Sequence, residues 1–237
     1  MRHTTRVTPT MPASIQTAAY ADTEILFDWH KVEGFKGGAI TGIQVVIRGT
    51  NGADQAAATL VGMDLFFATS RIPTLADGVN VSVDTTPTTL GTTGAIANTP
   101  GWFNNLVAYV PIVAADMNDD DLIFVTIASK SGLSIPVSGD LYVAAISKGA
   151  FDFTSTVTCT GVQAITQSAL VVGTTSALIN FAPGDVLHDE GDRAIGTVKS
   201  VTDANNMVMT TNLLNATVNG KDLYNLSPIQ LVLSSED

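Results

Sequence analysis

Short runs of alternating apolar and polar residues, separated by turn-forming residues, are the feature that most constrains this fold. The clearest run is residues 39–48, AITGIQVVIR, with one slip near Gly42 that indicates a bulge. Asn51-Gly52 follows it as a strong turn signal. Before residue 150, no helical pattern of useful length appears. The sequence therefore predicts an all-β protein.

Residues 20–150 predict roughly eight short strands at regular spacing, which is typical of a β-sandwich of the jelly-roll type. Within them, residues 55–68 read QAAATLVGMDLFFA, and a strand here would turn four apolar side chains toward the core: Val61, Met63, Leu65 and Phe67. The alanines at 56–58 would also suit a helix, but the glycine and β-branched residues nearby favour a strand. Trp29 and Trp102 are expected core anchors.

The pattern changes after Phe151, where turn signals separate short apolar runs as far as PIQLVL at residues 228–233. We expect a small β-barrel-like hairpin domain over residues 151–237, closed so that no sheet edge is left open. Residues 1–19 are rich in Thr, Pro and Ala and show no periodicity. They predict a flexible or partner-bound N-terminal arm.

Charge is scarce in this chain, and what there is has an acidic balance. Charged residues make up 14% of the sequence, against a usual quarter, and the net charge is −11. So little charge predicts that outer surface is buried against partners, the alternative being a neutral, wet surface rich in Thr and Ser. Scattered Lys and Arg argue against nucleic acid and anionic membranes as partners.

The composition also bears on the compartment. Residues 1–14 lack the apolar segment of a secretory signal, and no stretch has the ~18 apolar residues of a membrane span. Cys159 is the only thiol, so no intrachain disulfide can form. We expect a chain that is synthesised in a cytoplasm and kept or assembled there.

Two acidic clusters are the main candidates for a metal or catalytic site. Residues 116–121 could bind Ca²⁺ through Asp116, Asn118, Asp119, Asp120 and Asp121, but they lack the spacing of the known calcium loop, which favours a solvated turn. A metal or a general base could also use His188, Asp189, Glu190 and Asp192. Their place at a hairpin tip favours a merely polar turn.

The other reactive residue types give no site. Cys159 has no electropositive neighbours and is expected to be a small buried residue. His30 is expected to cap a strand end, and His3 lies in the arm. No nucleophile elbow and no phosphate-binding loop is present. The sequence predicts a non-enzyme with no catalytic, cofactor-binding or metal residues.

Residues 184–224, GDVLHDEGDRAIGTVKSVTDANNMVMTTNLLNATVNGKDLY, resemble small β-barrel segments in virion structural proteins of tailed bacteriophages. In those segments a Gly-Asp turn, a polar hairpin, a Gly-Thr-Val strand and an aliphatic strand recur. The first 150 residues are similar in style to phage jelly-roll proteins, with low charge and Thr-rich loops. The resemblance implies an accessory virion protein of the capsid decoration, or cement, type.

Such a protein would be a homo-oligomer, a trimer, that binds the major capsid protein on the outer capsid surface and stabilises contacts between shell subunits. Residues 1–19 would lie along a shell subunit by strand addition. Two alternatives stay open: a tail, collar or fibre component, and a carbohydrate-binding β protein that would need exposed aromatic residues. The sequence does not assign a role to the long loop at residues 84–100.

Overall fold

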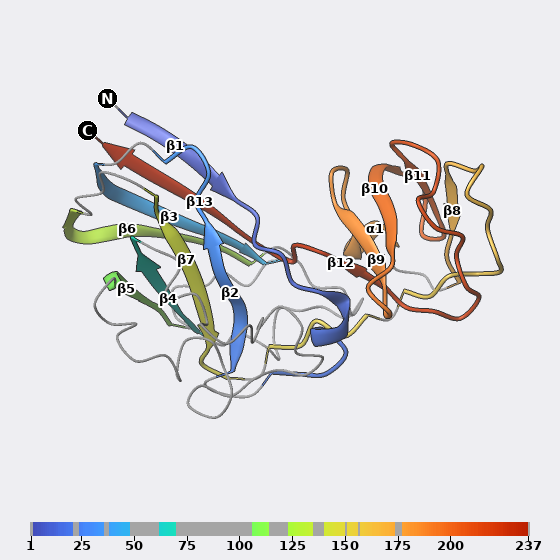
Figure 1. The fold of residues 1–237 in the computed structure, drawn as a ribbon, viewed down its shortest axis with the longest axis horizontal. Helices are drawn as coiled ribbons and strands as arrows, with labels where there is room; N and C mark the ends of the chain where they lie inside the picture. The colour runs from blue at the N-terminus through green and yellow to red at the C-terminus, as the bar shows by residue number, and fades with distance from the viewer. Residues whose placement is uncertain are drawn as a thin grey trace.

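The computed structural model describes residues 2–20, 24–35, 38–47, 62–69, 106–113, 123–134, 140–149, 151–155, 157–173 and 177–236. In these ranges the chain forms three antiparallel sheets, which confirms the expected all-β fold (Figure 1). The helical elements among these residues are a 3₁₀ turn, η1 (Ala13–Ile15), and a single-turn helix, α1 (Ala177–Asn180).

Two of the sheets are four-stranded and pack face to face as a sandwich. The first has the order β1-β13-β3-β6 and consists of β1 (Arg2–Val7), β13 (Ile229–Glu236), β3 (Ala39–Ile47) and β6 (Ile123–Ser134). The second has the order β2-β7-β4-β5 and consists of β2 (Ile25–Lys31), β7 (Tyr142–Ser147), β4 (Met63–Ala68) and β5 (Leu106–Ile112).

The strands of the sandwich pair in a nested order. The first strand pairs with the last, β2 with β7, β3 with β6, and β4 with β5. The first half of the strands is thus folded back along the second half, so both ends of the chain lie side by side (Figure 1). In the outermost pair, Arg2 lies opposite Glu236 and Val7 opposite Leu231.

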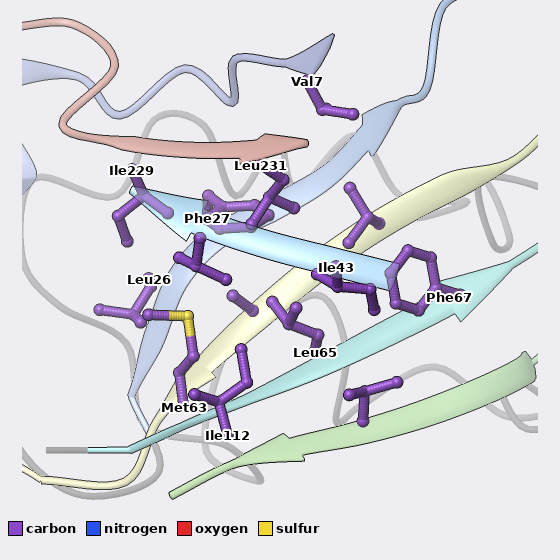
Figure 2. Close-up of a cluster of buried hydrophobic side chains, with 14 of the residues drawn as sticks. Val7, Leu26, Phe27, Ile43, Met63, Leu65, Phe67, Ile112, Ile229 and Leu231 are labelled. Carbon is purple, nitrogen blue, oxygen red and sulfur yellow. The ribbon is translucent and has the colours of Figure 1, made fainter. Parts of the chain in front are cut away.

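Period-two alternation builds the core between the two sheets. On β4, Met63, Leu65 and Phe67 point inward and are fully buried, as the sequence predicts. Figure 2 shows them against apolar side chains from the neighbouring and facing strands: Leu26, Phe27, Ile43, Ile112, Ile229 and Leu231. The expected strand residues 55–61 lie outside the described part of the chain.

The expected N-terminal arm differs from what is found. Residues 2–7 form the edge strand β1, and Met11 is buried, with its N–H donating to Leu226 O at 2.8 Å. The buried Gln16 amide donates to Met11 O and to Asn225 O at 2.6 and 2.9 Å. The segment lacks an obvious pattern because its partners come from the other end of the chain.

The third sheet forms the second part of the molecule. Its order is β12-β9-β10-β11-β8, and it consists of β8 (Ala169–Val171), β9 (Val186–Asp189), β10 (Ala194–Val201), β11 (Asn206–Met209) and β12 (Leu223–Asn225). Cys159 bridges to Val172 beside β8, and Thr158 bridges to Asp222 beside β12. The short segment at 158–159 therefore joins both edges of the sheet and closes it as a barrel.

The barrel has its own apolar core but not the expected C-terminal boundary. Its cluster runs from Val157 to Leu223. Residues 228–233, expected to close this unit, instead start β13, whose Ile229, Leu231 and Leu233 lie in the sandwich core. The barrel is therefore an insertion between β7 and β13. Its ends are adjacent, since Leu223 N–H donates to Val157 O at 2.9 Å.

Candidate functional site

A shallow hollow opens on the outer face of the sheet that contains β4 and β5. It has a volume of about 400 Å³ and is lined by Gly62, Asp64, Tyr109, Pro111, Ile112, Val113 and Lys148. The same alternation that turns Met63 and Leu65 into the core turns Asp64 outward into this hollow. The register places Asp64 opposite Pro111 and Phe66 opposite Tyr109.

Asp64 carries the charge at the centre of the hollow. Its side chain is only 8% exposed, and Lys148 Nζ lies 2.7 Å from its Oδ2. The Tyr109 hydroxyl donates to the other carboxylate oxygen, Oδ1, at 3.0 Å. A buried carboxylate without partners would be costly, so these two donors are what make the arrangement tolerable.

The Tyr109 hydroxyl is fixed as a donor. Burial, and then its hydrogen bond to Asp64, raise the pKa of Tyr109 above its usual value. The ring lies 5.3 Å from that of Phe66, centroid to centroid, in a tilted arrangement. Tyr109 is nonetheless 47% exposed, so its outer edge is available to a partner.

The backbone shapes the floor of the hollow. A Cβ on Gly62 would lie 2.2 Å from Ile112 O, so only glycine allows this approach of the two strands. Gly62 O in turn accepts a hydrogen bond from Lys148 N–H at 2.9 Å, just after β7 ends. That bond brings the lysine beside Asp64.

Apolar residues, including Pro111, form the rim of the hollow around the Asp64–Lys148 ion pair. Val113 and Tyr109 are both about half exposed. Pro111 lies on the edge strand β5, where it has no N–H to offer another strand. The hollow therefore suits capture of a side chain better than addition of a strand.

The arrangement suits the recognition of a partner. Both carboxylate oxygens of Asp64 are engaged by donors, Lys148 and Tyr109. An apolar surface with an exposed tyrosine and a neutralised charge at its centre has the character of a protein-binding patch. The one signal for this site in the sequence is an aspartate within an apolar strand, and nothing in the sequence links this residue to Tyr109 or Lys148.

The acidic hairpin singled out in the sequence is held by internal contacts. Asp189 is buried and accepts hydrogen bonds from Gly191 N–H, Arg193 N–H and the Arg193 guanidinium. Glu190 pairs with Lys221. Asp192, at a positive φ of 60°, accepts from Ser14 N–H at 3.3 Å. These carboxylates are thus used to shape the turn and to contact the sandwich.

Within the described ranges, no group of three or more His, Cys, Asp or Glu is placed to hold a metal ion. His188 lies on β9, His30 on β2 and His3 on β1, on three different strands. Burial lowers the pKa of His30. The acidic run 116–121, Trp102 and the loop 84–100 lie outside the described residues.

Two further residues have clear structural positions. Cys159 is buried where the barrel closes, and burial, helped by Asp189 and Asp222, raises its pKa to about 12. Trp29 is buried in a third apolar cluster that also contains Ile25, Ala68, Ala144 and Ile146. This position makes Trp29 unavailable as an exposed stacking platform for a sugar.

No family model, no curated protein and no solved structure matches this chain. In the part that the structure describes, no helix is long and apolar enough to cross a membrane.

Proposed function

We propose that this chain is a non-enzymatic accessory virion protein of the capsid decoration type. It binds the major capsid protein on the outer capsid surface and stabilises contacts between shell subunits. The observation that carries this proposal is the Asp64 hollow, an apolar rim around an already neutralised carboxylate. A protein partner can cover such a surface without burying an unpaired charge.

The architecture supports the same proposal. We propose that the sandwich is a jelly roll, because the eight strands that the structure describes in it pair first with last and inward from there. The barrel, inserted before the last strand, would project a second surface from the same subunit. The phage assignment itself rests on the resemblance of residues 184–224 and on the low charge of the chain.

The energetics of decoration would be those of avidity. Each subunit would make modest contacts with the shell and would also be held by its neighbours in a homo-oligomer, for which we propose a trimer. Linking several weak contacts raises overall binding by about 10²–10⁴ without any new contact. A shallow hollow of this kind is adequate under those conditions.

Substitution at the rim of the hollow tests the proposal. Tyr109→Ala removes the exposed ring and is expected to weaken binding to shells that lack the chain by about tenfold or more. Tyr109→Phe keeps the ring and loses only the hydroxyl, so it is expected to retain most of the binding. Co-sedimentation of purified protein with shells measures both. Equal binding by the alanine variant would overturn the role of the hollow.

A further inference from the structure

The described part of the barrel exposes several large aliphatic side chains. Val162 is 75% exposed and Leu214 61%. Among the described barrel residues, the exposed large aliphatic side chains, here named the barrel tip, are Val162, Ile165, Val171, Leu214 and Val218. Figure 1 shows β8, which contains Val171, at the end of the barrel away from the sandwich.

Hydrogen bonds hold these side chains outward in a fixed arrangement. The buried Gln163 amide donates to Val171 O and accepts from Val171 N–H, both at 2.8 Å. Gln163 N–H donates to Thr217 Oγ1 at 2.9 Å, and Thr217 N–H donates back to Gln163 O at 3.1 Å. The residues beside these bonds, Val162 and Val218, are therefore brought together, and their exposure does not come from a frayed loop.

A second tie joins Leu214 to the same surface. Leu213 N–H donates to Gln167 O at 2.9 Å, two residues beyond Ile165, and Leu213 is itself buried. Leu214 N–H donates to Ile195 O at 3.0 Å, so the backbone of Leu214 is held in place as well. The tip is thus preorganised, and a partner would not have to pay the entropy of ordering it.

The charge pattern identifies the kind of partner. Residues 153–184 and 204–220, which contain the whole tip, include no Asp, Glu, Lys, Arg or His, although the chain has a net charge of −11. Two cations that border these segments are paired: Arg193, whose guanidinium lies 3.5 Å from Ala216 O, binds Asp189, and Lys221 binds Glu190. Two such acidic molecules repel each other over most of their surface. A contact between tips places neutral segments together and keeps the acidic surfaces apart.

We infer that the barrel tip is the surface through which copies of this chain associate. A second copy brings the same neutral, apolar surface, so no charged group is buried unpaired on either side. A charged partner would meet, at the border of these segments, cations that are already paired, Arg193 with Asp189 and Lys221 with Glu190. The inference deepens the homo-oligomer of the proposed function by assigning its contact, and it rests on that part of the proposal.

Sedimentation velocity of the full chain, with and without a charge at the tip, is the test. Leu214→Asp and Val162→Asp are each expected to weaken self-association about tenfold or more, because a carboxylate would be buried without a partner. Val113→Asp, at the rim of the hollow, is the matched control and should leave self-association unchanged. Added NaCl should strengthen the wild-type oligomer by screening the acidic repulsion.

Circular dichroism shows whether each variant is folded. Leu214→Ser shows whether loss of the apolar side chain, without an added charge, is enough to weaken self-association. A stable oligomer that resists Leu214→Asp and Val162→Asp would overturn the tip contact and leave the proposed homo-oligomer intact. A wild-type chain that stays monomeric up to its solubility limit would overturn both.

Discussion

Asp64 connects residues from three separate segments of the chain. Alternation along residues 63–67 was enough to predict which side chains enter the core, and Met63, Leu65 and Phe67 are found there. The same pattern places Asp64 on the opposite face, but its partners, Tyr109 and Lys148, depend on strand order and register. Sequence alone cannot supply those, because they arise from pairing between distant strands.

Cys159 gives a residue-scale prediction about reactivity. Because burial raises its pKa to about 12, the folded chain should hold a neutral, inaccessible thiol at pH 8. Ellman's reagent should therefore react only as the barrel opens, with a rate that rises across the urea transition. Rapid reaction of the folded chain would contradict the closed barrel. Cys159→Ser, which has no thiol, sets the baseline.

The raised pKa of Cys159 also makes the stability of the folded chain depend on pH. The folded pKa lies above the ordinary value of about 9, so the unfolded thiol loses its proton first as the pH rises. The stabilising contribution is present below pH ~9 and is lost progressively up to about pH 12. The wild-type chain should lose more stability over this window than Cys159→Ser in paired urea titrations.

At the scale of elements, the sequence predicts the strands that have local alternation and turn residues. It does not predict β1, which lacks such a local pattern. The run at 39–47 and the hairpins after residue 184 were recognisable because alternation and turn residues are local. The sequence predicts an arm where β1 is found, since the strand's pattern of exposed and half-buried residues is weak and its partner, β13, lies at the other end of the chain. The last strand, β13, alternates clearly, but its expected place in the barrel is wrong because its partners, β1 and β3, lie far away in the sequence.

Deletion of residues 2–7 is expected to damage the sandwich. It removes the outermost strand, takes Val7 from the core and exposes the β13 edge to pairing with other chains. We expect a lower urea midpoint and aggregation, measured by tryptophan fluorescence and light scattering. Arg2→Ala, which loses only an exposed ion pair with Glu236, should change stability by less than about 1 kcal/mol. An unchanged midpoint after the deletion would mean that β1 is dispensable.

At the scale of the whole molecule, we propose that the nested sandwich binds the shell and that the inserted barrel binds other copies of the chain. The two halves of the sandwich sequence pair over long separations, and the barrel leaves and rejoins it at adjacent ends. The sandwich offers the Asp64 hollow and the barrel offers its neutral tip. One subunit would thereby have separate surfaces for the shell and for its own copies.

The most direct measurement is the amount of this chain per particle. Quantitative mass spectrometry of particles purified from a lysed culture that produces the chain compares its copy number with that of the major capsid protein. We predict comparable numbers, with cryo-electron microscopy density for sandwich and barrel on the outer shell. A handful of copies at the tail would indicate the tail alternative. Complete absence from the purified particles would contradict a virion role altogether.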